Sequence, residues 1–113
     1  GISLFLFYYA RYTKNERYEE YAQLLLESVF EDINEGTFPP TYCSGIAGVC
    51  WTIIHLVEYD FIKIENLEVL DDFDDYLFLS MREQIENDDF DFLHGATGIA
   101  FSLQKEYVRM RKF

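Results

Sequence analysis

Four side chains in this chain could ligate a soft metal ion, namely Cys43, Cys50, His55 and His94. Together they could form a tetrahedral nitrogen and sulfur site of the kind that zinc prefers. Their spacings match no compact zinc motif, and two pairs would have to converge from separate parts of the chain. We therefore favour the alternative, in which Cys50 is a buried small apolar residue and each histidine forms hydrogen bonds in the core or at its rim.

Two acidic groups could also carry chemistry. Residues 71–75, Asp-Asp-Phe-Asp-Asp, contain the D-D-x-x-D pattern that can hold magnesium and a diphosphate on a helix wall. We expect these acids to face solvent instead, because Phe73 belongs to an apolar stripe and the helix dipole favours negative charge near a helix start. A second group could supply the paired carboxylates of a glycosidase by fold analogy alone, and its members are Glu83, Glu86, Asp88 and Asp89.

The elements that would position these residues follow a repeat of about 50 residues. Gly45 and Gly48 form a Gly-x-x-Gly pattern with a large aromatic residue three places further on, and Gly95 and Gly98 form the same pattern. Gly1 begins a stretch in the same register, with spacings of 47 residues to Gly48 and then 50 to Gly98. A period of this length with two helices per unit is typical of a helical-repeat architecture.

Each Gly-x-x-Gly pattern opens a helix that is apolar nearly all round, which predicts an inner helix surrounded by protein. Amphipathic outer helices lie between them. The first is capped by Asn15 and stopped by Gly36 with the prolines that follow, and the second has Asn66 as a possible cap. The apolar stripe of the first consists of Tyr18, Tyr21, Ala22, Leu25, Val29 and Ile33, and that of the second of Leu70, Phe73, Leu77, Met81 and Ile85.

The sequence therefore predicts an all-α fold, a partial α/α toroid built of helical hairpins with inner and outer helices. A strand is conceivable only at residues 61–64. Residues 1–113 are expected to be a single fragment of a larger toroid domain, about two and a half hairpins, since the first residue falls inside a repeat motif. Such a fragment would expose apolar inner-helix surface and self-associate.

Charge and composition exclude several partners. Nine basic residues against 21 acidic ones give a formal net charge of −12, which repels nucleic acid and anionic lipid. Such a surface would attract a cationic peptide, although a strongly acidic surface more often serves solubility alone. The apolar runs at residues 2–10 and 45–57 are shorter than the roughly 20 residues that cross a bilayer, so no membrane span is expected. Cys43 and Cys50 would be too far apart on one helix for a disulfide, which favours a reducing, cytoplasmic setting.

Residues 38–51, FPPTYCSGIAGVCW, and residues 89–100, DFDFLHGATGIA, resemble successive repeat motifs of lanthionine synthetase C-like proteins. The resemblance runs through essentially the whole chain and covers about the first third of such a protein. It implies an α/α toroid whose glycine-rich turns gather around the active site. It also implies a cyclase that uses zinc, held by two cysteines and a histidine, to add peptide cysteine thiols to dehydroalanine or dehydrobutyrine. The implied partners are a dehydrated precursor peptide and a lanthipeptide dehydratase.

The resemblance carries one catalytic role to this chain, that of an active-site aspartate, onto Asp91. Taken alone, an aspartate just ahead of a helix is a helix-start residue, because its carboxylate accepts hydrogen bonds from free backbone N–H groups. The family's zinc ligands and its catalytic histidine and arginine belong to later repeats, so we expect them beyond residue 113. The chain alone would then bind no catalytic zinc and would be inactive.

Two other functions stay open. One is a related enzyme that adds a small thiol such as glutathione to dehydrated residues. The other is a non-catalytic helical-repeat module that binds a peptide on its inner rim. A cysteine followed downstream by Cys-His-Gly would favour an enzyme over the module.

Overall fold

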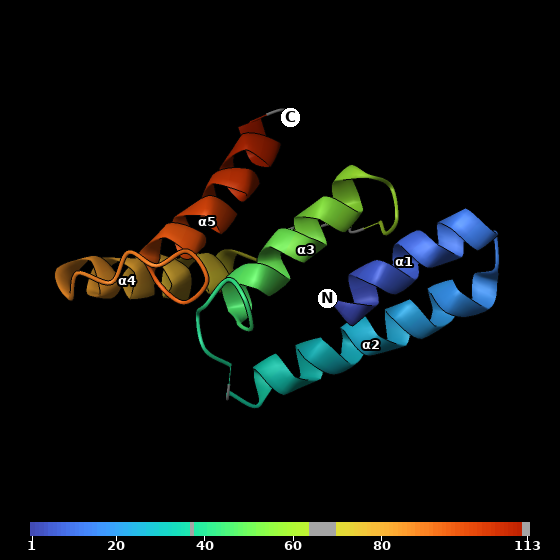
Figure 1. The fold of residues 1–113 in the computed structure, drawn as a ribbon, viewed down its shortest axis with the longest axis horizontal. Coiled ribbons are helices and arrows are strands. Elements are labelled where there is room, and N and C mark those ends of the chain that lie inside the picture. The colour runs from blue at the N-terminus through green and yellow to red at the C-terminus, as the bar shows by residue number, and fades with distance from the viewer. Residues whose placement is uncertain (37, 64–69, 112–113) are drawn as a thin grey trace. The chain divides into compact units, whose positions relative to one another are not determined.

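The computed structural model describes residues 1–36, 38–63 and 70–111 and, of residues 109–111, the backbone alone. Within these ranges the chain forms no strand but five α-helices (Figure 1), which are α1 (Ile2–Thr13), α2 (Glu16–Asn34), α3 (Ile46–Glu58), α4 (Asp71–Glu86) and α5 (Ala96–Arg111). None of them is long and apolar enough to cross a membrane. The all-α class is confirmed for the described residues, whereas the toroid stays a prediction.

Two compact units make up the chain, Gly1–Phe38 and Pro39–Phe113. The first is the hairpin of α1 and α2, which lie side by side (Figure 1). Ala22 on α2 is fully buried, and its carbonyl oxygen accepts a hydrogen bond of 2.9 Å from the Ser3 hydroxyl on α1. The small side chain of Ala22 thus lets the two helix backbones approach closely.

The ends of α2 agree with the sequence. Asn15 caps its start, because the Asn15 side chain accepts a hydrogen bond of 3.0 Å from the backbone N–H of Arg17. Its end is followed by Gly36, whose φ of 82° lies in the left-handed region that favours glycine. Of the predicted stripe, Ala22 and Ile33 are buried, whereas the tyrosines are exposed.

The second unit is built around α3, and α4 and α5 both pack against it and against each other. Six residues of α3 are buried, as its apolar sequence predicts, whereas its place as an inner helix of a toroid stays a prediction: Ile46, Ala47, Cys50, Ile53, Ile54 and Leu56. The helix α5 is joined to α3 by a buried hydrogen bond of 2.7 Å from the Ser102 hydroxyl to the Ala47 carbonyl oxygen. Near the other end of α3, Lys105 forms an ion pair of 3.3 Å with Glu58.

Leu77 of α4 and Leu70, the residue before its start, lie in the core, whereas Phe73 and Met81 are half-buried and Ile85 is exposed. The predicted stripe is therefore confirmed for its first four positions. The possible cap Asn66 and residue 64 of the conceivable strand lie outside the described residues, and residues 61–63 form no strand. Large apolar side chains are exposed on α1 and α5, among them Phe5, Tyr12, Phe101 and Val108, so self-association stays a prediction with a physical basis.

Replacing Asn15 by alanine removes the capping acceptor of α2. We expect Asn15→Ala to lower the free energy of unfolding by about 1 kcal/mol, because one backbone N–H loses its partner. Urea denaturation followed by circular dichroism measures this change. Asn15→Asp keeps an acceptor at the same place and should retain the wild-type value, and an equal loss in both variants would contradict the capping role.

Candidate functional site

Two turns of the same construction precede the helices α3 and α5. We name residues 39–45 the first glycine turn and residues 89–95 the second glycine turn. In each turn, two backbone N–H groups at the helix start bond to carbonyl oxygens four and seven residues upstream. These bonds run from Gly45 to Thr41 (3.1 Å), from Ile46 to Pro39 (2.9 Å), from Gly95 to Asp91 (3.0 Å) and from Ala96 to Asp89 (3.1 Å). The repeat seen in the sequence is therefore a repeat of backbone structure.

The second glycine of each pattern is required by a close backbone approach. A Cβ atom at Gly98 would collide with the carbonyl oxygen of Phe92, and one at Gly48 would collide with the carbonyl oxygen of Tyr42. Each carbonyl belongs to the turn that folds back over the first turn of its helix. Only glycine leaves room for this approach, and Gly98 would also meet the Tyr42 side chain of the neighbouring turn.

The two glycine turns touch one another. The backbone N–H of Cys43 donates a hydrogen bond of 3.1 Å to the carbonyl oxygen of Leu93. The Tyr42 ring meets the Phe92 ring edge to face with centroids 4.9 Å apart, and it meets Phe101 at 5.8 Å. The starts of α3 and α5 therefore lie together, with both turns at one end of the helix pair (Figure 1).

Asp91 lies in the second glycine turn with 56% of its side chain exposed. Its Oδ2 accepts a hydrogen bond of 2.8 Å from the backbone N–H of His94 and lies 3.3 Å from the His94 Nδ1. The backbone N–H of His94, more than any other cause, lowers the pKa of the Asp91 carboxyl. Asp91 is therefore an ionised carboxylate at neutral pH, positioned ahead of α5 and accessible to a ligand.

The four cysteine and histidine side chains do not gather. Cys43 and His94 are exposed, whereas Cys50 is fully buried, and burial raises the pKa of its thiol. The His55 ring stacks on the Trp51 ring with their centroids 4.9 Å apart, and burial lowers the pKa of His55. The expected roles of Cys50 as a buried small residue and of His94 as a hydrogen-bonded rim residue are confirmed.

Among the described residues, none of these four belongs to a group of three ligands close enough to hold one ion. The side chains present therefore do not fit the two cysteines and one histidine that the resemblance implies for zinc. No chemical step in this chain can be assigned to that metal.

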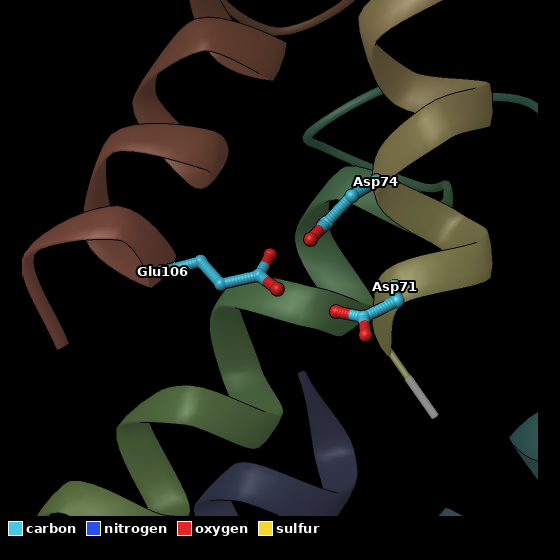
Figure 2. Close-up of side chains that lie close together, drawn as sticks. All are labelled: Asp71, Asp74 and Glu106. Atoms are coloured by element: carbon cyan, nitrogen blue, oxygen red, sulfur yellow. The ribbon is translucent and has the colours of Figure 1, made fainter. Parts of the chain in front are cut away.

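Three carboxylates gather between α4 and α5, and sequence reasoning missed them. Asp71 and Asp74 lie one turn apart on α4 and face Glu106 of α5 (Figure 2), and one oxygen of each lies within 4.8 Å of the others. The expectation that the acids of residues 71–75 all face solvent is wrong for Asp74, which is half-buried. A signal did exist for Glu106, because it lies four residues after Ser102 and seven after Ile99, on the buried face of α5.

The buried acids hold a proton between them. Glu106 is only 4% exposed, and burial, together with a hydrogen bond to Asp74 and the charge of Asp74, raises the pKa of Glu106 to about 9. Burial also raises the pKa of Asp74, while the hydrogen bond with Glu106 opposes that rise. At neutral pH a protonated Glu106 therefore donates its hydrogen bond to an ionised Asp74.

Comparison with known protein families gives a match over almost the whole chain. A family model described as lanthionine synthetase C-like protein matches residues 1–112. No curated protein and no solved structure matched the chain in the corresponding searches.

Gly98→Ala tests whether the close approach at the second glycine turn is required. Alanine favours a helix over glycine by about 1 kcal/mol, but here its Cβ collides with the Phe92 carbonyl oxygen. We expect the net result to be a loss of about 2 kcal/mol in the free energy of unfolding, measured by urea denaturation. A gain in stability would contradict the close approach. Ala100→Gly, at an exposed position of the same helix, is the control and should cost only about 1 kcal/mol.

The shared proton makes stability depend on pH. Folded Glu106 keeps its proton up to about pH 9, whereas its ordinary pKa is 4.5, so between these values the folded state binds more protons than the unfolded state. In this range the free energy of unfolding should therefore fall as pH rises, by about 1 kcal/mol per pH unit. Urea denaturation in EDTA buffer at about pH 6 and about pH 8 measures this decline.

Glu106→Gln should reduce the decline by that amount, because glutamine does not titrate. Asp72→Asn removes an exposed acid from the turn of α4 that holds Asp71 and Asp74. This variant should lose stability with rising pH as the wild type does. The same pH dependence in wild type and Glu106→Gln would show that Glu106 does not hold the proton.

Proposed function

We propose a function from one premise: this chain belongs to the lanthionine synthetase C-like family. The function is that of the amino-terminal part of a zinc-dependent cyclase, an α/α toroid that adds peptide cysteine thiols to dehydroalanine or dehydrobutyrine and forms lanthionine thioethers. The observation that supports this function best is the contact between the two glycine turns at one end of α3 and α5. Asp91 lies in the second of these turns, and its side chain is exposed to solvent.

The chemistry assigned to this chain is a proton-accepting role for Asp91. In the addition, the thiol gives up its proton, the sulfur forms a bond to the Cβ of the dehydrated residue, and the Cα–Cβ π electrons move toward the carbonyl. The resulting enolate then takes up a proton at Cα. Zinc, when bound by residues outside this chain, lowers the pKa of the thiol. Asp91 is ionised at neutral pH and therefore acts as an acceptor, which receives a proton or orients a donor group of the peptide.

His94 would support this role by position. Its backbone N–H holds the Asp91 carboxylate at 2.8 Å, and its ring nitrogen lies 3.3 Å from the same oxygen. The carboxylate is thus oriented from two sides before a peptide arrives. A site whose groups are oriented in advance loses less entropy and less solvent reorganisation on reaching the transition state.

The proposed substrate is a dehydrated precursor peptide, supplied by a dehydratase that removes water from serine or threonine. A net charge of −12 favours a peptide with basic residues over an acidic one. The two cysteines are free thiols, in keeping with a reducing, cytoplasmic location. The same chemistry with glutathione as the thiol is the alternative reaction.

Asp91→Asn in the full-length protein tests the proposal. We expect zinc content to stay at the wild-type level and the cyclisation rate to fall by a factor of about 100 or more, because the acceptor charge is lost. Cyclisation leaves the peptide mass unchanged, so the readout is the number of free thiols that N-ethylmaleimide alkylates, counted by mass spectrometry. Incubation with glutathione in place of a peptide thiol separates the two reactions.

Asp88→Asn is the matched control, since Asp88 is an exposed acid ahead of the same turn. Its φ of 57° is one that asparagine tolerates well, so the backbone should be unchanged. This variant should cyclise at the wild-type rate. A wild-type rate in Asp91→Asn would remove Asp91 from the mechanism, and no thiol consumption by the wild type would favour a peptide-binding module.

A further inference from the structure

The acidic cluster of Asp71, Asp74 and Glu106 lies apart from the glycine turns. Two of its members come from α4 and one from α5, and the three carboxyl groups point toward one another (Figure 2). Glu106 follows the start of α5 by ten residues, whereas Asp91 precedes that start by five. The cluster therefore occupies a different part of the helix pair from the proposed active site.

Two oxygens of this cluster are buried without a hydrogen-bond partner. They are Oδ1 of Asp74 and Oε2 of Glu106, and Glu106 as a whole is 96% buried, being 4% exposed. Lys105, the residue before Glu106, forms its ion pair with Glu58 on α3. A buried carboxyl oxygen left without a partner costs about 1–3 kcal/mol, so a ligand that satisfies both oxygens would stabilise the site.

We propose that Asp71, Asp74 and Glu106 bind a hard divalent cation, with calcium as the ion of best fit. Carboxylate oxygens are the ligands that calcium and magnesium prefer, whereas zinc sites in proteins rely on cysteine and histidine. The site is thus distinct in ligand chemistry from the zinc site that the family resemblance implies.

Calcium fits better than magnesium because of size. Calcium holds oxygens at about 2.3–2.6 Å, so two ligands on opposite sides of the ion lie up to about 5 Å apart, whereas magnesium at about 2.1 Å allows only about 4.2 Å. The three oxygens all lie within 4.8 Å of one another, which is inside the span that calcium allows. Three carboxylates offer at most six oxygens, and water can complete the coordination shell.

A path to the cluster exists. A groove of about 520 Å³ between α4 and α5 is lined by Asp74 and Glu106 together with apolar residues such as Phe78, Met81 and Leu103. An ion and its water ligands can reach the two buried carboxyl groups through this groove. The bound ion would join the outer helix α4 to the inner helix α5 and replace the proton that the two acids share.

Calorimetric titration of the EDTA-treated protein with calcium chloride, in chelator-free buffer, tests the proposal. We expect one calcium ion per chain, with weaker binding of magnesium chloride in a parallel titration. Glu106→Gln should bind calcium at least tenfold more weakly, because the ligand set loses a charged oxygen. Asp74→Asn should do the same from the other helix.

Asp72→Asn is the matched control, because Asp72 is an exposed acid beside Asp71 that is absent from the cluster, and its replacement removes one carboxylate from α4 as Asp74→Asn does. It should bind calcium within twofold of the wild type. Absence of saturable binding to the wild type below about 1 mM calcium would overturn the proposal, as would equal affinities of the wild type and Glu106→Gln. Equal losses in Asp72→Asn and Glu106→Gln would reduce the effect to net charge and also overturn it.

Discussion

The backbone of α5 at Gly98 and the carbonyl oxygen of Phe92 approach so closely that a Cβ atom has no room between them, and Gly48 and Tyr42 repeat this contact in α3. Because each turn folds back over the first turn of its helix, the backbone N–H groups at the helix start find acceptors within the turn. The side chains of the turn are then held at the helix start. The position of Asp91 follows from this constraint.

Two such turns side by side determine how the second unit is built. The hydrogen bond from Cys43 to Leu93 joins the turns, and the one from Ser102 to Ala47 joins the helices that follow them. Equivalent ends of α3 and α5 therefore lie together, and α4 packs against both helices. This is the arrangement of neighbouring units in a helical repeat, where each unit covers apolar surface that the other cannot bury alone.

Much of this could be predicted from residue types and spacing. Gly45, Gly48, Gly95 and Gly98 mark backbone positions with no space for a side chain, and Asn15 is a capping residue wherever a helix begins after it. The contact of Asp74 with Glu106 could not be predicted, because apolar periodicity shows which face of a helix is buried but not what lies opposite. The separation of Cys43, Cys50, His55 and His94 was predicted, because their spacings match no compact zinc motif.

The pKa values of two carboxyl groups near α5 are shifted in opposite directions. Asp91 precedes the helix start, where backbone N–H groups and the positive end of the dipole favour its charge, and its pKa is lowered. Glu106 lies inside the helix, and burial, together with its hydrogen bond to Asp74, raises its pKa. An apolar residue at position 106 would avoid this desolvation cost, as replacement of buried ionic groups by apolar ones commonly does. Stability alone therefore does not account for a glutamate there, whereas a ligand that needs carboxylate oxygens from both helices does.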